Sequence, residues 1–299
     1  MVRSTDSPLA CVVFGPPFAG SRNGEAVAMM PRMPKVLYEK RDRIAYVTLN
    51  RPEARNAIDP ETQELLVETW TDFRDDDAVD VAILTGAGEA FCAGADLKTY
   101  IPPIIRGERR IRDIVDLGFG GFTRGLHKIT KPIIGAVNGW ALAGGLEQAL
   151  ACDIRIASER AMFGSFEARR GYHHGDGGIV RLVNACGVGV ASHLLLTAEP
   201  IDARQALQWN LVTKVVAHDR LMEEAELVAH QILRNSQRAV RSAKETIQEV
   251  VGQDLDAQLR IEAWNAYTCA DAEETLGLLQ RFYDKSDAGR AGSHETALA

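Results

Sequence analysis

Two glycines and a carboxylate stand close together in the segment GWALAGGLEQALACD, residues 139–153. Gly144 and Gly145 expose the backbone, and Glu147 follows them at the start of an apolar run with helical spacing. The first N–H groups of a helix have no partner within it, and the helix dipole places about half a positive charge behind them. The segment therefore predicts a binding place for a negatively charged oxygen, unless the glycines only allow a strand and a helix to pack closely.

A second segment, FCAGADLK at residues 91–98, has the same character. It follows the short apolar run VDVAILTG (79–86), and its turn holds the small residues Ala93, Gly94 and Ala95. Two exposed backbone segments, each after a buried strand, can direct two N–H donors at one oxygen. Such an oxyanion hole stabilises an enolate or a tetrahedral intermediate, and losing one donor typically raises the barrier by about 2.7–4 kcal/mol.

Four segments together resemble those of the crotonase, or enoyl-CoA hydratase/isomerase, superfamily. They stand in the family's order, and the resemblance covers about residues 35–290; the segments are LNRPEARNAI, FCAGADLK, VNGWALAGGLEQALACD and MFGSFEARRG. The resemblance implies an α/β fold, the crotonase spiral of repeated ββα units with a helical C-terminal subdomain. It also implies a homotrimer, or a hexamer built as a dimer of trimers, in which these helices often complete a neighbour's site.

Carried over residue by residue, the resemblance places the oxyanion hole at the N–H groups of Ala95 and Gly144, and the catalytic carboxylates at Glu147 and Glu167. The spacing of the two acids is that of the hydratase branch, whereas many relatives with other activities keep only one acid. The resemblance implies that Glu167 donates a proton to C2 of a 2-enoyl-CoA thioester while Glu147 activates the water that adds at C3. Taken alone, each acid has a plain alternative: a first-turn acid favoured by the helix dipole, or a surface acid in the run EARR.

CoA enters this interpretation as part of the substrate, and neither a metal nor a redox cofactor is expected. The resemblance implies that the substrate and its CoA part are bound by Gly144 and by Ala95, Asp96, Leu97 and Lys98, with Lys98 near the adenine end. Further cations are candidates for phosphate contacts, although a solvated basic face explains the last three equally well: Arg51, Arg55, Arg106, Arg109 and Arg110. Lys285 resembles a basic family position near the C-terminus.

The sequence departs from the common hydratase pattern just before each of the two glutamates and in the turn that follows Glu167. Ala143 replaces the first of three glycines, Phe166 replaces a proline before the second acid, and GYHHGDGG stands where many relatives have a PGxGG-like turn. His173, His174 and Asp176 in that turn could mark a polar specificity feature or an additional acid–base set. A plain turn made by its glycines is the favoured interpretation.

Other functions fit parts of the same pattern. An isomerase, or a dehydratase of a specialised acyl-CoA such as a carnitinyl-CoA-like compound, would use the same oxyanion hole with Glu167 as its main acid. A CoA-thioester hydrolase and a non-catalytic acyl-CoA-binding paralogue are further alternatives. A dinucleotide-binding protein is excluded because GVGVAS (187–192) and GGLEQA lack the third glycine in register.

Alternating strands and helices must position these residues. Apolar runs at 36–50, 79–86, 131–139 and 152–158 predict strands, and Asp59-Pro60 predicts a helix N-terminus. This order is typical of parallel strands with helices outside them. From Asp219 onward the pattern is helical throughout. We therefore expect a disordered N-terminal extension at 1–34, an α/β core at 35–218 and a helical trimerisation region at 219–299.

The whole chain fits a soluble enzyme better than a nucleic-acid or membrane protein. Its 299 residues are 46% hydrophobic, and its formal net charge of −7 opposes general attraction to nucleic acid or anionic lipid. No apolar run is expected to reach the roughly 20 residues of a membrane span. Five scattered cysteines fit a reducing compartment. We expect a cytoplasmic protein whose partner is an acyl-CoA thioester, with no nucleic-acid or membrane partner.

Overall fold

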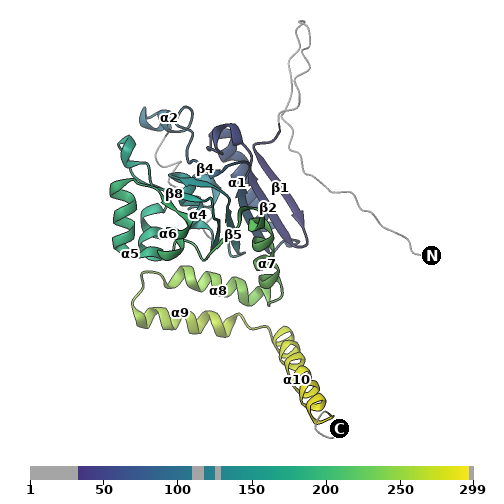
Figure 1. The fold of residues 1–299 in the computed structure, drawn as a ribbon. Helices are drawn as coiled ribbons and strands as arrows, with labels where there is room; N and C mark the ends of the chain where they lie inside the picture. The colour runs from purple at the N-terminus through teal and green to yellow at the C-terminus, as the bar shows by residue number, and fades with distance from the viewer. Residues whose placement is uncertain (1–32, 110–117, 125–128, 296–299) are drawn as a thin grey trace, which may run out of the picture. The chain divides into compact units, whose positions relative to one another are not determined.

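The computed structural model describes residues 33–109, 118–124 and 129–295, with side chains described as far as residue 284. The chain divides into two compact units, Met1–Arg234 and Asn235–Ala299, with the α/β elements in the first and only helices in the second (Figure 1). The expected N-terminal extension lies almost entirely outside the described residues.

The first unit is built on a large sheet in which all but one of the pairings are parallel. Its strand order is β1-β2-β3-β5-β7-β10, and only β1 and β2 pair antiparallel. The strands expected from the apolar runs are confirmed, because β3, β5 and β7 are those runs and β3 and β5 are buried along almost their whole length. The bounds are β1 (Val36–Arg41), β2 (Ile44–Leu49), β3 (Val81–Gly86), β5 (Ile133–Val137), β7 (Ile154–Ser158) and β10 (Lys214–Val216).

A second, smaller sheet holds short strands that the sequence did not reveal. Its order is β4-β6-β8-β9, with β4, β6 and β8 parallel. Each of these three follows a strand of the large sheet, and α4 and α5 follow β6 and β8, so the expected repetition of ββα units is confirmed. The bounds are β4 (Ala90–Cys92), β6 (Trp140–Leu142), β8 (Met162–Gly164), β9 (Ile201–Asp202), α4 (Gly144–Ala151) and α5 (Gly178–Thr197).

Helix α1 (Pro60–Asp75) begins as the sequence predicts. The Asp59 side chain accepts a hydrogen bond from the Thr62 N–H, and Pro60 occupies the first turn, where its missing N–H costs nothing. Leu66, Trp70 and Phe73 lie on one face and are fully buried. The remaining short helices of this unit are η1 (Pro52–Ala54), α2 (Ile101–Ile105), η2 (Phe119–Gly121), η3 (Ala168–Arg170), α6 (Ala203–Gln208) and η4 (His218–Arg220).

Helix α7 (Leu221–Leu233) belongs to the first unit, so the α/β body ends after Arg234 rather than at residue 218 as expected. Its buried residues Leu221, Ala225 and Ala229 pack against β3, β5 and β7. Removing this apolar face from water, at about 25 cal/mol per Å², holds the helix on the sheet. The sequence pattern is helical from this point, but the hydrophobic face of α7 is directed at the sheet rather than at the helices after it.

The second unit consists of α8 (Gln237–Val250), α9 (Leu255–Thr268) and α10 (Ala272–Glu295), as the helical C-terminal pattern predicts. Helices α8 and α9 pack against each other, and the Asn265 amide donates to Thr246 Oγ1 between them. Several large apolar side chains of α9 and α10 are exposed, among them Trp264 and Tyr267. The trimerisation role remains a prediction.

Among the described residues, α5 alone is long and apolar enough to cross a membrane, with a mean hydropathy of 1.7. The expectation that no apolar run reaches the length of a membrane span was therefore wrong. The 20 residues of α5 are apolar enough on average, but the small residues around Gly187 interrupt the run of large apolar side chains in the sequence. One such helix is weak evidence for a span, since helices of soluble proteins pass the same test. Arg181 in its first turn donates to the backbone oxygens of Thr123 and Asp176, which fixes this end within the protein.

Candidate active site

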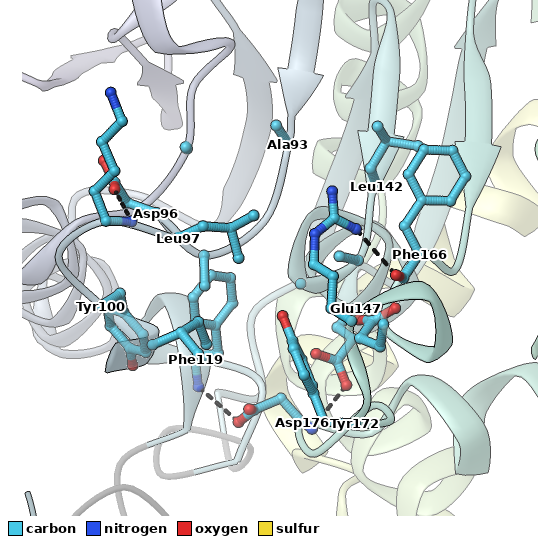
Figure 2. A pocket seen from close by; sticks show the side chains of 18 of the residues that line it. Ala93, Asp96, Leu97, Tyr100, Phe119, Leu142, Glu147, Phe166, Tyr172 and Asp176 are labelled. Atoms are coloured by element: carbon cyan, nitrogen blue, oxygen red, sulfur yellow. Dashed lines mark hydrogen bonds between the residues drawn. The ribbon is translucent and has the colours of Figure 1, made fainter. Parts of the chain in front are cut away.

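The candidate site lies where β4, β6 and β8 end. These strands are parallel neighbours, so their carboxyl ends meet at one edge of the small sheet. Ala95 follows β4, Gly144 and Glu147 follow β6, and Glu167 follows β8. All four line one pocket of about 820 Å³, in which Figure 2 shows Glu147. The structure thus brings together the residues that the sequence proposed for catalysis.

Two backbone N–H groups are available at this edge. Ile58 forms a parallel bridge with the segment after β4: its N–H donates to the Gly94 oxygen, and its oxygen accepts from the Asp96 N–H, both at 2.8 Å. Because both neighbours of Ala95 bond to Ile58, the Ala95 N–H faces away from Ile58. Gly144 is the first residue of α4, where an N–H has no partner in the helix. In the part of the chain that the structure describes, neither N–H donates to another group. They are candidates for an oxyanion hole.

Glycines allow the two segments to approach each other. A Cβ on Gly94, whose φ is +90°, would lie 2.9 Å from the Gly144 nitrogen, and a Cβ on Gly145 would lie 2.0 Å from the Cys92 oxygen. A Cβ on Gly144 would lie 2.5 Å from the Phe119 ring. Side chains at these positions would push the donors apart or fill the space in front of them.

Ala143 holds the backbone strain of this turn. Its φ of 53° and ψ of −125° belong to a region that favours glycine. We expect Ala143→Gly to raise the free energy of unfolding by about 1 kcal/mol, because relieved strain outweighs the entropy that glycine loses on folding. Urea denaturation would measure the difference. Ala151→Gly, in the helical backbone at the end of α4, is the control and should lower the free energy of unfolding. If Ala143→Gly lowers it by the same amount, Ala143 is not strained.

Glu147 is buried, and one of its two carboxylate oxygens carries all its contacts. Its Oε1 accepts from Asp176 N at 2.7 Å and from Gly178 N at 3.0 Å, and lies 3.3 Å from His174 Nδ1. Burial raises the pKa of Glu147, but His174 and the two N–H donors outweigh it and hold the pKa below its usual value. Its Oε2 has no partner among the described residues. The carboxylate is therefore ionised and fixed, with one oxygen left for a ligand.

Glu167 is equally buried and lies beside Glu147. Its Oε2 accepts from Ser165 Oγ at 3.2 Å, and its Oε1 lies 2.8 Å from His174 Nδ1. One oxygen of each glutamate and a His174 nitrogen all lie within 4.8 Å of one another. The two carboxyl groups thus face the same space, as paired acid–base catalysis requires.

His174 is not the plain turn residue that the sequence favoured. Its side chain is completely buried, and its Nδ1 lies against Oε1 of both glutamates as an ion pair. Neither ring nitrogen makes a directed hydrogen bond within the described residues. Burial alone would lower the pKa of His174, but the two carboxylates raise it to about 9. The imidazole is therefore protonated at neutral pH.

Asp176 connects the histidine turn with the wall of the pocket. Its side chain accepts from Phe119 N at 2.8 Å and pairs with Arg124 at 2.9 Å, while its own N–H donates to Glu147 (Figure 2). Burial raises the pKa of Asp176, and the charge of Glu147 raises it further. His173 differs from its neighbour because its Nδ1 interacts with the backbone oxygen of His174. Asp176 thus orients the turn that holds Glu147.

The part of the pocket near Glu147 has an aromatic and aliphatic lining. The side chains of Tyr100, Phe119, Leu142, Phe166 and Tyr172 surround the space near Glu147 (Figure 2). Tyr100 and Phe119 meet edge to face at 5.5 Å between ring centroids. The sequence analysis did not single out Phe119, Tyr100 or Tyr172, since isolated aromatics without spacing carry no signal for a pocket.

The proposed CoA-binding residues line the same pocket. Ala95, Asp96, Leu97 and Lys98 are among its lining residues, and Lys98 is exposed. The other candidate cations fall into separate groups. Arg51 and Arg55 also line the pocket, although Arg51 is engaged by Asp59 and Asp96. Arg106 pairs with Glu108 and Arg109 stacks over Tyr100, and neither lines the pocket. Arg110 and the side chain of Lys285 lie outside the described part of the chain.

Comparison with known proteins identifies similar chains across most of this length. Residues 39–289 match the family described as "Enoyl-CoA hydratase/isomerase". The Short-chain-enoyl-CoA hydratase of Clostridium acetobutylicum is 39% identical over 252 residues, which cover 84% of this chain and 95% of that relative. The (E)-benzylidenesuccinyl-CoA hydratase of Thauera aromatica is 42% identical over 222 residues, covering 74% and 84%. A crystal structure of enoyl-CoA hydratase from Bacillus anthracis superposes with a TM-score of 0.75 at 34% identity, covering 84% and 97%.

Proposed function

We propose that this chain, which belongs to the enoyl-CoA hydratase/isomerase family, adds water across the C2=C3 double bond of a 2-enoyl-CoA thioester. The observation that carries the proposal is the meeting of two buried glutamates and two unpaired N–H groups in one pocket. The first pair supplies acid and base, and the second pair supplies an oxyanion hole. The relatives named as hydratases support the same reaction.

In this reaction the thioester oxygen accepts hydrogen bonds from the N–H groups of Ala95 and Gly144. Charge moves onto this oxygen as C2 and C3 react, and fixed donors stabilise it most at that point. Glu147 takes a proton from water through its unpaired Oε2, and the water oxygen bonds to C3. Glu167 donates a proton to C2. Since two N–H donors and the His174 imidazole hold Oε1 of Glu147, the base stays oriented before the substrate arrives.

We also propose that CoA enters only as part of the substrate and that no metal or redox cofactor takes part. Glu147, Glu167 and His174 offer possible ligand atoms within 4.8 Å of one another, so the assay below includes a chelator to test this part of the proposal. Exposed Lys98 and Arg55 are the candidate partners for the CoA phosphates and adenine.

Assembly and location are further parts of the proposal. Exposed apolar side chains on α9, including Trp264 at 73% and Tyr267 at 86%, support burial in a homotrimer or hexamer. Among the described residues, Cys92, Cys186 and Cys269 are free thiols, which supports a reducing, cytoplasmic location.

The deciding experiment is an assay across straight, branched and cyclic 2-enoyl-CoA esters in the presence of a metal chelator. Hydration is followed as the loss of absorbance of the conjugated thioester. Reaction in ¹⁸O-labelled water should place the label in a hydroxyl at C3, whereas an isomerase would leave the product unlabelled. Absence of turnover with every ester would refute the proposed function.

A further inference from the structure

The position of the His174 ring is fixed by its contacts with two glutamates and by the close packing of Gly178. A Cβ on Gly178 would lie 2.5 Å from Cγ and 2.6 Å from Nδ1 of His174, so the ring fills room that only glycine at the start of α5 leaves. From this place Nδ1 reaches Glu167 at 2.8 Å and Glu147 at 3.3 Å. The imidazole is thus the one group on the described chain that contacts both acids.

Because His174 Nδ1 contacts Oε1 of each glutamate, Oε2 of each is the oxygen that remains for the reaction. Oε1 of Glu147 is engaged by His174, Asp176 and Gly178, and Oε1 of Glu167 is engaged by His174. Oε2 of Glu147 stays without a partner among the described residues, and Oε2 of Glu167 has only the Ser165 hydroxyl. A carboxylate that is held through one oxygen presents the other in a defined direction.

The charges around the imidazole favour a shared proton. Glu147 on α4 and Glu167 after β8 face it directly, and Tyr172 and Asp176 belong to its own loop. Cations of the site have other partners: Arg124 pairs with the Asp176 side chain, Arg181 on α5 donates to the Asp176 backbone oxygen, and Arg170 donates to the Phe166 backbone oxygen. Two buried carboxylates without a counter-ion would repel each other strongly. A protonated His174 leaves the three groups with one net negative charge.

We infer that His174 is a third member of the acid–base set: it positions both glutamates and carries the proton that a two-glutamate site would otherwise place on one of them. The inference rests on the proposed hydration and adds a residue to it. His174 acts through Glu147 and Glu167 rather than on the substrate, and so it is a positioning and proton-holding residue.

The proton balance of the cycle follows from these contacts. His174 gives its proton to Glu167, and Glu167 gives a proton to C2. Glu147 takes a proton from the water whose oxygen bonds to C3, and passes it to His174. One O–H bond of water and the C=C π bond are lost, while one C–O and one C–H bond form. The site ends with the single proton it began with, so no exchange with solvent is needed.

The test compares His174→Asn with His174→Ala in the full chain. The amide nitrogen of asparagine takes the place of Nδ1 and still donates, but it cannot carry the proton. We expect kcat/KM of His174→Asn at pH 7 to fall at least about 10-fold, with its alkaline limb moved at least one pH unit lower than the wild-type limb near pH 9. His174→Ala should show the same shift and a larger loss. His230→Asn, on the exposed side of α7, is the control and should retain the wild-type profile.

Direct titration by NMR makes the result independent of turnover. The His174 ring signal should titrate near pH 9 in the wild type and well below pH 6.5 in Glu147→Gln/Glu167→Gln, where only burial remains. A uniform loss of rate at every pH, with no shift of the alkaline limb, would make His174 structural and overturn the inference. A wild-type profile in His174→Asn would overturn it as well. If the wild type hydrates no ester, the proposed function fails instead, whatever the ring titration shows.

Discussion

Glu167→Gln is expected to lower kcat for hydration of a 2-enoyl-CoA by about 10²–10⁴-fold and to leave KM nearly unchanged. The amide keeps the volume of the side chain and an oxygen for the Ser165 hydroxyl, but it cannot donate the carboxyl proton to C2. Glu147→Gln should fall in the same range because the water loses its base. Since the two acids act as a unit, the double variant should lose less than the product of the two single losses. Steady-state kinetics at pH 7 would measure all three.

The matched control is Glu199→Gln, a change of the same type at an exposed acid that pairs with Arg169. It should keep the wild-type kcat. Thermal unfolding of each variant must show a folded protein before its rate is interpreted. A Glu167→Gln enzyme that works within threefold of the wild type would remove Glu167 from the mechanism.

Loss of the Gly144 N–H should lower kcat nearly as much as the loss of either glutamate. Gly144 is the first residue of α4, where proline is tolerated because no helical hydrogen bond is lost. A side chain there would collide with the Phe119 ring, so room is made by combining the change with Phe119→Ala. We expect Gly144→Pro/Phe119→Ala to have a kcat about 10²–10³-fold lower than its control, which corresponds to the loss of one oxyanion donor.

The control for that comparison is Gly144→Ala/Phe119→Ala, which carries the same Cβ and the same vacated space but retains the N–H. The ratio of the two kcat values separates the loss of the N–H from the effect of the added Cβ. Equal rates in these two variants would show that the thioester oxygen is held elsewhere.

The long strands and the helix starts were predictable because their signals are local. A continuous apolar run such as 79–86 has few alternatives to a buried strand, and Asp59-Pro60 combines two independent signals for a helix N-terminus. The grouping of Ala95, Gly144, Glu147 and Glu167 was accessible only through four segments that resemble a known family. The geometry then explains that grouping, since the segments after β4, β6 and β8 leave the same edge of the small sheet.

The rest was hidden because it depends on contacts between distant parts of the chain. Strands β4, β6 and β8 have three residues each, too few for an alternating pattern to appear. His174 stands in a glycine-rich turn, where a plain turn is the simpler interpretation, and its burial results from α5 and two acids that come from other elements. The end of the α/β body was misplaced because the pattern of α7 gives its helical period but not the surface it packs on.

Two of the four groups proposed for catalysis are main-chain amides, and this shapes how such a site can change over evolutionary time. A substitution at position 95 alters a side chain but leaves the amide in place. The loops that leave β4 and β6 can therefore change side chains at such positions without loss of the reaction, whereas Gly94, Gly144 and Gly145 must stay small. Acyl preference can therefore drift through these loops while the chemistry at the thioester persists. The edge of the small sheet keeps the reacting groups in place while the surrounding side chains change which substrates bind.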